Sequence, residues 1–442
     1  RPTRRDSRTP LKGLHHQGAL RSGASTGGGR GLSQLWQWIP GNDSMLIYDA
    51  IADPVAAVVY VLVVNEDITN GQVEAFNVNT GAAVWTVPMA NIGCDTVYLN
   101  SFAMHLSGAT LVVICDWAGG IDTSSGAVRW RTAWNPGSDT GNWEGAVADG
   151  VFYSAMLPSY TQPSTFFAQR VSDGKMLWQV PYGPLVLNVV VSADSVAVVE
   201  NSMPGFMVGF DKSSGKVLWN VSTQQGVAAA CGAPGKTVFV GLSDNGTVNA
   251  IDARTGAPSW TYSVPVPDAA FGLATLAGAS RLIVTTLASV TALDCNTGAA
   301  SWQFYGPAAH VDPPSSAFQF HSIAQISGER VLAGFHFGDV AVIDAANGSS
   351  AFNISWACTD PFSQKQTFGC DYVAPLASCQ GLTLWTSRRL PSFMGEPYVN
   401  VPALMDSVTG EMVASWGMGF TSGVMVTAAA GANIGLYWTG SV

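Results

Sequence analysis

A short motif recurs along the whole chain and constrains its fold more than any other feature. With some variation it reads [Ala/Gly]-x-[Asp/Asn]-x-x-[Thr/Ser]-Gly-x-x-x-Trp, as in Ala250–Trp260, AIDARTGAPSW. Its glycines fall at eight positions spaced by 47 residues on average: Gly81, Gly126, Gly174, Gly215, Gly256, Gly298, Gly348 and Gly410. A period in this range is typical of stacked or radially arranged units.

Each part of the motif has a physical role. The alternating apolar residues before the Asp, as in Thr247–Asp252, predict a β-strand, and the residues after the glycine predict a second one. The Gly supplies a positive φ for the tight hairpin between them, and the Asp carboxylate accepts hydrogen bonds from turn amides. The Trp buries a large flat surface, but its indole N–H needs a partner, so we expect it at the seam between neighbouring sheets. The tryptophans predicted to dock adjacent sheets in this way are Trp85, Trp130, Trp178, Trp219, Trp260 and Trp302.

One or two further strand candidates precede each motif, for example Gly235–Ser243 and Ser280–Ala288. Four short strands in a repeat of this length is the plan of a β-propeller blade, whereas solenoid repeats are usually shorter. The motif resembles the tryptophan-docking motif of quinoprotein repeats, which are named for pyrroloquinoline quinone (PQQ). The resemblance covers nearly all of Leu32–Val442 and implies an all-β, eight-bladed propeller of four-stranded antiparallel blades. The family includes calcium- and quinone-dependent alcohol dehydrogenases, and non-enzymatic propellers such as the lipoprotein of the bacterial outer-membrane barrel-assembly machine.

Charge divides the chain into two regions. Residues 1–31 carry a net charge of +6, are rich in Gly, Ser and Arg, and lack periodicity, so we expect a disordered segment. Residues 32–442 form the expected propeller and carry a net charge of −16, which argues against nucleic acid as a partner. No run of 18 apolar residues is present, so no transmembrane helix is expected.

Closure of the ring has two readings. Ser33–Trp38 resembles the outer strand of a blade, and Gly423–Val442 resembles two further strands. Either eight blades close and the two ends are extra, or the ends build one blade together and a degenerate repeat is an insertion. In both interpretations the ring closes, which avoids an open sheet edge that could pair with other chains.

Cysteines and glycosylation sequons favour a secreted glycoprotein with disulfides, with a cytoplasmic or organellar protein as the alternative. Cys358, Cys370 and Cys379 cluster in one segment, and Cys94 with Cys115 is another plausible pair. Five Asn-x-Ser/Thr sequons are present, at Asn42, Asn220, Asn245, Asn347 and Asn353.

Catalytic signatures are missing from the sequence. The quinoprotein dehydrogenases that the chain resembles carry a vicinal cysteine disulfide over PQQ and a calcium site of Glu, Asn and Asp. This sequence has no Cys-Cys pair and no compact acidic cluster, so neither PQQ nor calcium is supported and no cofactor or metal is expected. It also has no G-x-S-x-G, H-E-x-x-H or P-loop motif, and no catalytic residue is assigned.

Ligand contacts in propellers are usually residues that line the mouth of the central channel. The candidates for that position are His105, Trp143, Glu144, His321 and His336. Histidines there could bind a metal, and an aromatic beside an acid could hold a sugar or a peptide. The competing interpretation is that these residues satisfy backbone groups or pack within their own blade.

The sequence therefore favours a non-catalytic binding or scaffolding propeller that makes protein–protein contacts through its faces and loops. The long segment Asn353–Ala403, interpreted as an insertion, is the first candidate contact surface. The alternatives are a divergent quinoprotein-type oxidoreductase and a secreted carbohydrate-binding or hydrolytic propeller.

Overall fold

The structure of the chain, a computed structural model, consists almost entirely of β-strands. The expected basic segment 1–31 lies outside the residues that it describes. The described residues are 32–38, 45–53, 55–65, 71–77, 80–93, 103–115, 118–132, 142–156, 164–182, 186–200, 205–223, 228–232, 236–242, 247–264, 270–275, 281–286, 289–305, 323–326, 330–334, 339–355, 370–379, 382–389, 399–406, 412–415, 424–429 and 432–436.

Consecutive strands of the described chain form eight four-stranded antiparallel sheets, called blades 1 to 8 below. Blades 1 to 4 are built from β2 (Met45–Asp53), β3 (Val58–Asn65), β4 (Gly71–Asn77), β5 (Ala83–Pro88); β6 (Ala103–Ser107), β7 (Thr110–Ile114), β8 (Ala118–Asp122), β9 (Val128–Arg131); β10 (Asn142–Ala148), β11 (Val151–Met156), β12 (Ser164–Arg170), β13 (Met176–Tyr182); and β14 (Val186–Val191), β15 (Ser195–Glu200), β16 (Gly205–Asp211), β17 (Val217–Thr223). Blades 5 to 8 are built from β18 (Ala228–Cys231), β19 (Val238–Leu242), β20 (Thr247–Asp252), β21 (Pro258–Ser263); β22 (Ala270–Thr275), β23 (Arg281–Thr286), β24 (Ser289–Asp294), β25 (Ala300–Tyr305); β26 (Ile323–Ile326), β27 (Arg330–Gly334), β28 (Asp339–Asp344), β29 (Ser350–Ser355); and β30 (Cys370–Cys379), β31 (Leu382–Arg389), β32 (Val399–Asp406), β33 (Met412–Ser415).

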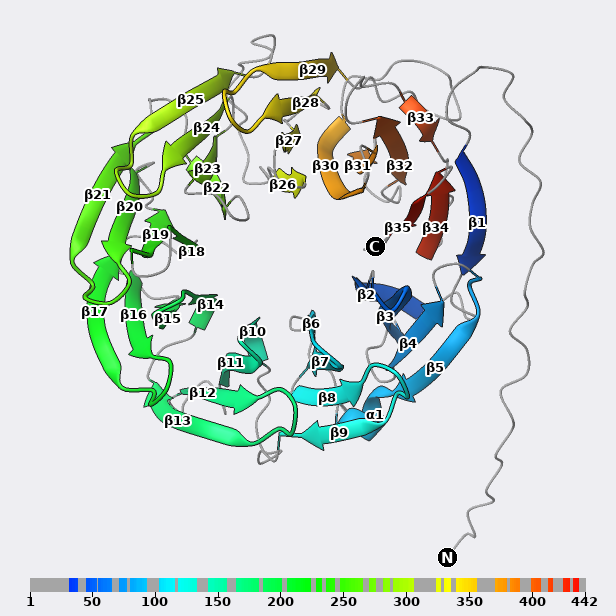
Figure 1. Cartoon of the computed structure of the whole chain (residues 1–442), viewed down its shortest axis with the longest axis horizontal. Coiled ribbons are helices and arrows are strands. Elements are labelled where there is room, and N and C mark those ends of the chain that lie inside the picture. The colour runs from blue at the N-terminus through cyan, green and yellow to red at the C-terminus, as the bar shows by residue number, and fades with distance from the viewer. Residues whose placement is uncertain are drawn as a thin grey trace, which may run out of the picture.

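The blades are arranged radially around a central axis (Figure 1). In each blade the first strand is innermost and the fourth is outermost, and the innermost strands β2, β6, β10, β14, β18, β22, β26 and β30 contact one another in that order. This arrangement confirms the predicted all-β propeller of four-stranded antiparallel blades. Each of the eight motif repeats contributes one such blade.

The two ends of the chain form a ninth, three-stranded sheet. β1 (Leu32–Trp38) pairs with β34 (Val424–Ala429), which pairs in turn with β35 (Ala432–Leu436). In Figure 1 this sheet lies between blade 8 and blade 1, with β1 on the outside. The ends thus pair with each other as one reading of the sequence expected, but no repeat is lost as an insertion.

The segment Asn353–Ala403 is not an insertion, and that prediction was wrong. It contains β30, β31 and the start of β32, which are the inner strands of blade 8. β30 has ten residues and is longer than the innermost strand of any other blade. The motif of this repeat is spread out at Leu404–Trp416, so the sequence did not show where the blade's own strands begin.

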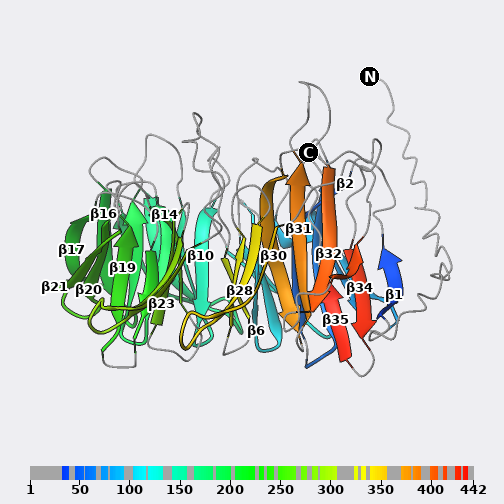
Figure 2. The same cartoon turned by 90° about the horizontal axis from the view of Figure 1, so that it is seen from above.

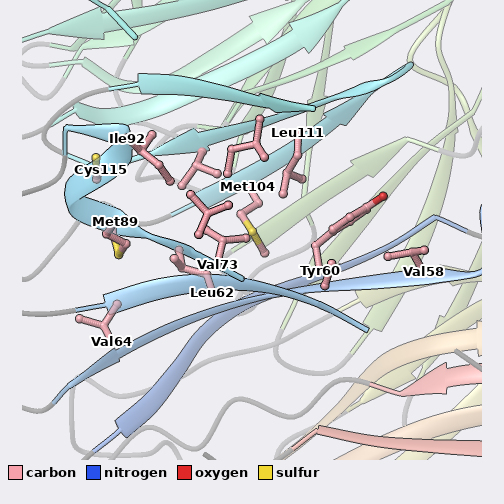
Figure 3. Packing of buried hydrophobic residues seen from close by; sticks show 14 residues of the cluster. Val58, Tyr60, Leu62, Val64, Val73, Met89, Ile92, Met104, Leu111 and Cys115 are labelled. Atoms are coloured by element: carbon pink, nitrogen blue, oxygen red, sulfur yellow. The ribbon is translucent and has the colours of Figure 1, made fainter. Parts of the chain in front are cut away.

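The hydrophobic core lies between neighbouring blades. All five residues of β7 are buried, and successive side chains point to opposite faces of the strand. Leu111 and Val113 pack toward blade 1, against Tyr60, Leu62 and Val73 (Figure 3), whereas Val112 and Ile114 pack toward blade 3. Burying each such side chain stabilises the fold by about 1.5–3 kcal/mol. The strand β7 is therefore a continuous apolar run, because both of its faces are covered by neighbouring blades.

One short helix, α1 (Met89–Ile92), follows blade 1 and is wedged beside blade 2. Met89 and Ile92 are its buried residues and belong to the same cluster as Tyr60 and Leu62. A Cβ on Gly119 of β8 would lie 2.1 Å from Cγ2 of Ile92, so glycine is required there for the helix to fit. Within the described part of the chain, no helix is long and apolar enough to span a membrane.

The two faces of the ring differ in what they carry. Because alternate strands of an antiparallel blade run in opposite directions, the Asp–Gly turn after the third strand lies opposite to the start of the first strand. We call the face with these turns the turn face, and the face where the innermost strands begin the start face. In the side view of Figure 2 the start face is at the top, toward which β31 points.

Candidate functional site

The turns that end at the motif Gly have nearly the same backbone geometry in blades 1 to 7. Their first residue is an Asp in five of these blades, Asn77 in blade 1 and Arg170 in blade 3. In blade 5 the Gly256 N–H donates to the Asp252 carbonyl at 2.8 Å, and the Asp252 N–H donates to the Ala257 carbonyl at 2.8 Å. The Asp252 carboxylate oxygen Oδ1 accepts the N–H groups of Arg254 and Thr255, and also the Thr255 hydroxyl. The carboxylate thus satisfies the amides of the turn locally, which leaves the carbonyl of the residue after Asp available to the neighbouring blade.

The motif indole of one blade donates its Nε1–H to the carbonyl at this position in the next blade, where the preceding residue is an Asp in five cases and Arg170 in blade 3. The six bonds are Trp85 to Thr123 at 2.9 Å, Trp130 to Val171 at 2.6 Å, Trp178 to Lys212 at 2.8 Å, Trp219 to Ala253 at 3.0 Å, Trp260 to Cys295 at 2.8 Å and Trp302 to Ala345 at 2.9 Å. Five of these rings are buried and Trp85 is partly buried. The indoles therefore lie between consecutive blades, each with its polar group satisfied.

The glycines flanking the indole explain the small residues of the motif. A Cβ on Gly209, in the same blade as Trp219, would lie 2.1 Å from Cε2 of that ring. A Cβ on Gly256, in the turn of the next blade, would lie 2.5 Å from its Cγ. The ring is thus held between two backbones, and the motif Gly is needed for this close approach as well as for its φ of 69°.

A feature that the sequence did not reveal is a β-bulge at the residue before the motif Trp, or before Phe352, which replaces that Trp in blade 7. In blade 4, Gly209 pairs with Trp219 and Phe210 with Val217, so Leu218 has no partner of its own. The same shift occurs in blades 1 to 3 and 5 to 7. Apolar residues at this position are exposed on the outer rim: Val84 at 46%, Leu177 at 39% and Leu218 at 42%. The bulge is visible only from strand register, because any residue type can occupy it.

Hydrogen bonding in the turns shifts the pKa of several motif carboxyls. The Ser124 hydroxyl and the Arg129 guanidinium hold the pKa of Asp122 well below its usual range. The hydroxyls of Ser213 and Ser214 lower the pKa of Asp211 in the same way. Both carboxylates are thus anionic and stabilise their turns by accepting hydrogen bonds. Glu74 on β4 differs, because burial raises the pKa of its carboxyl although the Gln72 side chain donates to it.

A disulfide joins blades 5 and 6 beside an indole dock. Cys231 ends β18, Cys295 follows Asp294 in the next blade, and their Cα atoms are 5.7 Å apart. The Cys295 carbonyl also accepts the Trp260 N–H, and both cysteines are buried. The sequence missed this pair because 64 positions separate its members.

Of the cysteines considered from the sequence, Cys115 is disulfide-bonded. Cys94, its predicted partner, lies outside the described residues, as does Cys358. Cys370 and Cys379 stand at the two ends of β30. The predicted pairing of Cys94 with Cys115, and the pairing within the other cluster, therefore stay predictions.

The channel-mouth candidates are only partly described. His105 is half-buried on β6, opposite Val112, and Trp143 and Glu144 lie on β10, the next innermost strand, which contacts β6. His321 and His336 lie outside the described residues. Within the described ranges, no three His, Cys, Asp or Glu side chains group together in a way that could hold a metal ion.

The innermost strands have a second set of bulges, near their starts. A register shift occurs early in β2, β10, β14, β22 and β30. The residues for which the register gives no partner there are Tyr48, both Trp143 and Glu144, Leu187, Phe271 and Asp371. Since all innermost strands begin on the start face, these positions form a ring around that face. We call them the bulge ring.

Comparison with known proteins agrees with this architecture. Residues 116–225 and 204–357 match a family model, PQQ_2, described as "Outer membrane protein assembly factor BamB". The two matches overlap and together cover more than half of the 442 residues. No curated protein sequence matches the chain.

Solved structures with TM-scores above 0.5 are similar at low sequence identity, which shows the fold alone. The computationally designed Ika8 protein is 12% identical with a TM-score of 0.53, over 87% of this chain and 99% of the designed one. The quinohemoprotein alcohol dehydrogenase ADHIIG of Pseudomonas putida HK5 is 13% identical with a TM-score of 0.51, over 81% of this chain and 72% of the enzyme. BamB of Moraxella catarrhalis is 15% identical with a TM-score of 0.48, over 76% of this chain and 92% of BamB. The repeats, the indole docks and the family match agree: the chain belongs to the PQQ-repeat β-propeller family, the family of the model that is described as outer membrane protein assembly factor BamB.

Proposed function

We propose that this propeller is a non-catalytic binding protein whose start face, at the bulge ring, contacts a protein partner. The observation that carries the proposal is the early bulge in five of the eight innermost strands. A bulge re-aims side chains and interrupts pairing, and bulges are over-represented beside functional sites. On the turn face, the motif residues are instead engaged in turn formation and blade docking.

The residue types of the bulge ring fit a protein partner. Three of the positions are aromatic, namely Tyr48, Trp143 and Phe271, and two blades contribute the acids Glu144 and Asp371. Aromatic residues are enriched at the centres of protein interfaces, where a few of them supply most of the binding energy. Three aromatic residues on the innermost strands of three different blades are suited to an extended partner surface.

The family description supports the same class of function. The matching model is described as an outer membrane protein assembly factor, which supports a role that involves contacts with proteins. On this basis we assign the chain a scaffolding role, with a partner to be identified by experiment.

Site-specific photo-crosslinking tests the proposal. A photoreactive amino acid replaces Tyr48, Trp143 or Phe271 in the full chain, and Arg254 on the turn face serves as the matched control. Irradiation in the native source should join one and the same partner to the three start-face positions and not to position 254. Crosslinks that are equal at all four positions, or different proteins at each start-face position, would contradict the proposal.

A divergent oxidoreductase is the second candidate, because the family takes its name from the PQQ cofactor. Titration of the purified chain with PQQ and Ca²⁺, followed by visible absorbance, decides between the two functions. Saturable binding that is abolished by Glu144→Gln or His105→Gln, but not by Arg254→Gln, would favour the oxidoreductase. A featureless titration is the result that the scaffolding role predicts.

We further propose that the protein works in the secretory pathway or outside the cell. The buried disulfide of Cys231 with Cys295 and the disulfide-bonded Cys115 support an oxidising environment, since such bonds are rare in the cytosol. Alkylation of free thiols in protein from its native source, before and after reduction, measures the oxidation state. Free Cys231 and Cys295 in the native protein would exclude this location.

A further inference from the structure

We infer that Asn220 and Asn347 are N-glycosylation sites, and that the glycan on Asn220 covers an apolar part of the outer rim. This inference rests on the proposed secretory location. Asn220-Val-Ser222 and Asn347-Gly-Ser349 are two of the five sequons, and both asparagines belong to the described part of the chain, where both are exposed.

Asn220 stands on β17, the outermost strand of blade 4. The buried Trp219 points inward, and its exposed neighbours Leu218 and Asn220 point to solvent. Ser222, the third residue of the sequon, is exposed two positions further along the same face. The Asn and Ser of the sequon are therefore accessible on the rim of the folded ring, whereas Val221 between them is partly buried.

The surface next to Asn220 combines exposed apolar side chains with the free edge of a strand. Val217 stands opposite Phe210, Leu218 occupies the bulge beside it, and the two are 51% and 42% exposed. β17 is an edge strand, with one side of its backbone unpaired within its sheet. Exposed apolar residues on an edge strand promote pairing with other chains, and proteins protect such edges with polar or bulky groups. A hydrophilic glycan on Asn220, two and three positions away from them, would serve that purpose.

Asn347 lies in the turn of blade 7 and differs from its counterparts. In blades 2, 4, 5 and 6 this position is Ser125, Ser214, Thr255 or Thr297, whose hydroxyl donates to the turn Asp. Asn347 donates only its backbone N–H to Asp344, at 3.1 Å, and its Oδ1 accepts the Ser349 N–H at 2.8 Å. Its Nδ2, the atom that a glycan would be attached to, has no partner within the described residues.

The chemistry needs one co-reactant, a lipid-pyrophosphate-linked oligosaccharide of the secretory pathway. The asparagine Nδ2 forms a bond to the anomeric carbon of the first sugar and loses one proton. The bond from that carbon to the pyrophosphate oxygen breaks, and the lipid pyrophosphate leaves. No oxidation or reduction takes place.

Peptide mapping of the full chain, secreted from a eukaryotic host, tests the inference. Release of glycans by peptide-N-glycosidase F in H₂¹⁸O marks each occupied asparagine as ¹⁸O-labelled aspartate. In the wild type the label is expected at positions 220 and 347. It should be lost from position 220 in Asn220→Gln and Ser222→Ala, and from position 347 in Asn347→Gln and Ser349→Ala. It should remain at position 220 in Ser222→Thr, which keeps the sequon. Asn296→Gln is the matched control, because Asn296 is exposed in the turn of blade 6 but is not part of a sequon.

A second readout addresses the covering role. Light scattering of Asn220→Gln and Ser222→Ala should show increased self-association. Changing Val217 and Leu218 to Ser in the same variants should reverse it. The control Asn347→Gln should stay monodisperse. Unlabelled asparagines at positions 220 and 347 in secreted protein with an intact Cys231–Cys295 disulfide would overturn the inference and leave the proposed location standing. Reduced cysteines in the native protein would refute the location itself, and the inference with it.

Discussion

At the scale of single residues, the motif glycine of one blade and the indole of the preceding blade require each other. Trp219 is held between Gly209 in its own blade and Gly256 in the next, and its N–H is bonded to the Ala253 carbonyl. Neither glycine could carry a Cβ without displacing the ring. Trp219 and these three neighbours thus form one unit of blade docking. The indole N–H to carbonyl hydrogen bond of this unit occurs six times among the described blades.

This mutual dependence predicts that Gly256→Ala is strongly destabilising. A positive φ costs a residue with a side chain about 1–2 kcal/mol, and forcing a methyl group against a packed ring adds about 1–3 kcal/mol. Gly150→Ala is the matched control, because Gly150 has a φ of 72° but nothing within 4 Å of an added Cβ. Urea denaturation should show a clearly lower midpoint for Gly256→Ala than for Gly150→Ala. Equal midpoints would mean that the indole does not occupy the space beside Gly256.

The turn carboxylates predict a loss of stability in acid. Hydrogen bonds from Ser213 and Ser214 lower the pKa of Asp211 in the folded chain, so its contribution is present at neutral pH and is lost as pH falls below about 4. The melting temperature of the wild type should fall in that range, and Asp211→Asn should show a weaker decrease. An Asp211→Asn variant with the same pH dependence as the wild type would show that this carboxylate is not linked to folding.

At the scale of the elements, the joints between blades are not all alike. Most described joints combine an apolar cluster with one indole dock, but the joint of blades 5 and 6 also contains the Cys231–Cys295 bond. The joint of blades 3 and 4 has an ion pair instead, with Lys212 Nζ 2.8 Å from Asp149 Oδ2. That pair is partly exposed and contributes little, so the covalent joint is the one with a measurable role of its own.

The disulfide predicts a specific loss of stability when it is removed. A bond that closes a loop of this length stabilises a protein by about 2–4 kcal/mol, mainly by restricting the unfolded chain. The double variant Cys231→Ala, Cys295→Ala should unfold at a lower urea concentration than the oxidised wild type, with the fold unchanged by circular dichroism. If the two proteins unfold at the same concentration, the cysteines are not joined in solution.

At the scale of the whole molecule, the periodic residues determined what could be predicted. The spacing of Gly81 to Gly410 indicated the number of four-stranded blades, and the need of an indole N–H for a partner indicated the place of Trp219 and its counterparts. Features that depend on register or on distant contact were not accessible. Leu218 and Phe271 occupy bulges that any residue type can occupy, and Cys231 meets Cys295 only because consecutive blades are neighbours. Blade 8 was interpreted as an insertion because its motif is irregular.

The candidate site was predicted less well than the fold for a related reason. His105, Trp143 and Glu144 stand on the neighbouring innermost strands β6 and β10, but no motif links them in sequence. Residues that act from different blades leave no local pattern, so their grouping follows only from the ring. His321 and His336 stay predictions.

The central claim is that six indoles act as hydrogen-bonded joints between blades, and solvent exchange of their N–H groups tests it most directly. In protein labelled with ¹⁵N only at tryptophan, the indole signals of Trp85, Trp130, Trp178, Trp219, Trp260 and Trp302 can be assigned by Trp→Phe changes. Transfer to D₂O should leave the signals of the five buried rings visible long after exposed indoles have exchanged, with Trp85 the fastest of the six. Rapid exchange of all six signals in the folded protein would contradict the account, because it would place these N–H groups in water.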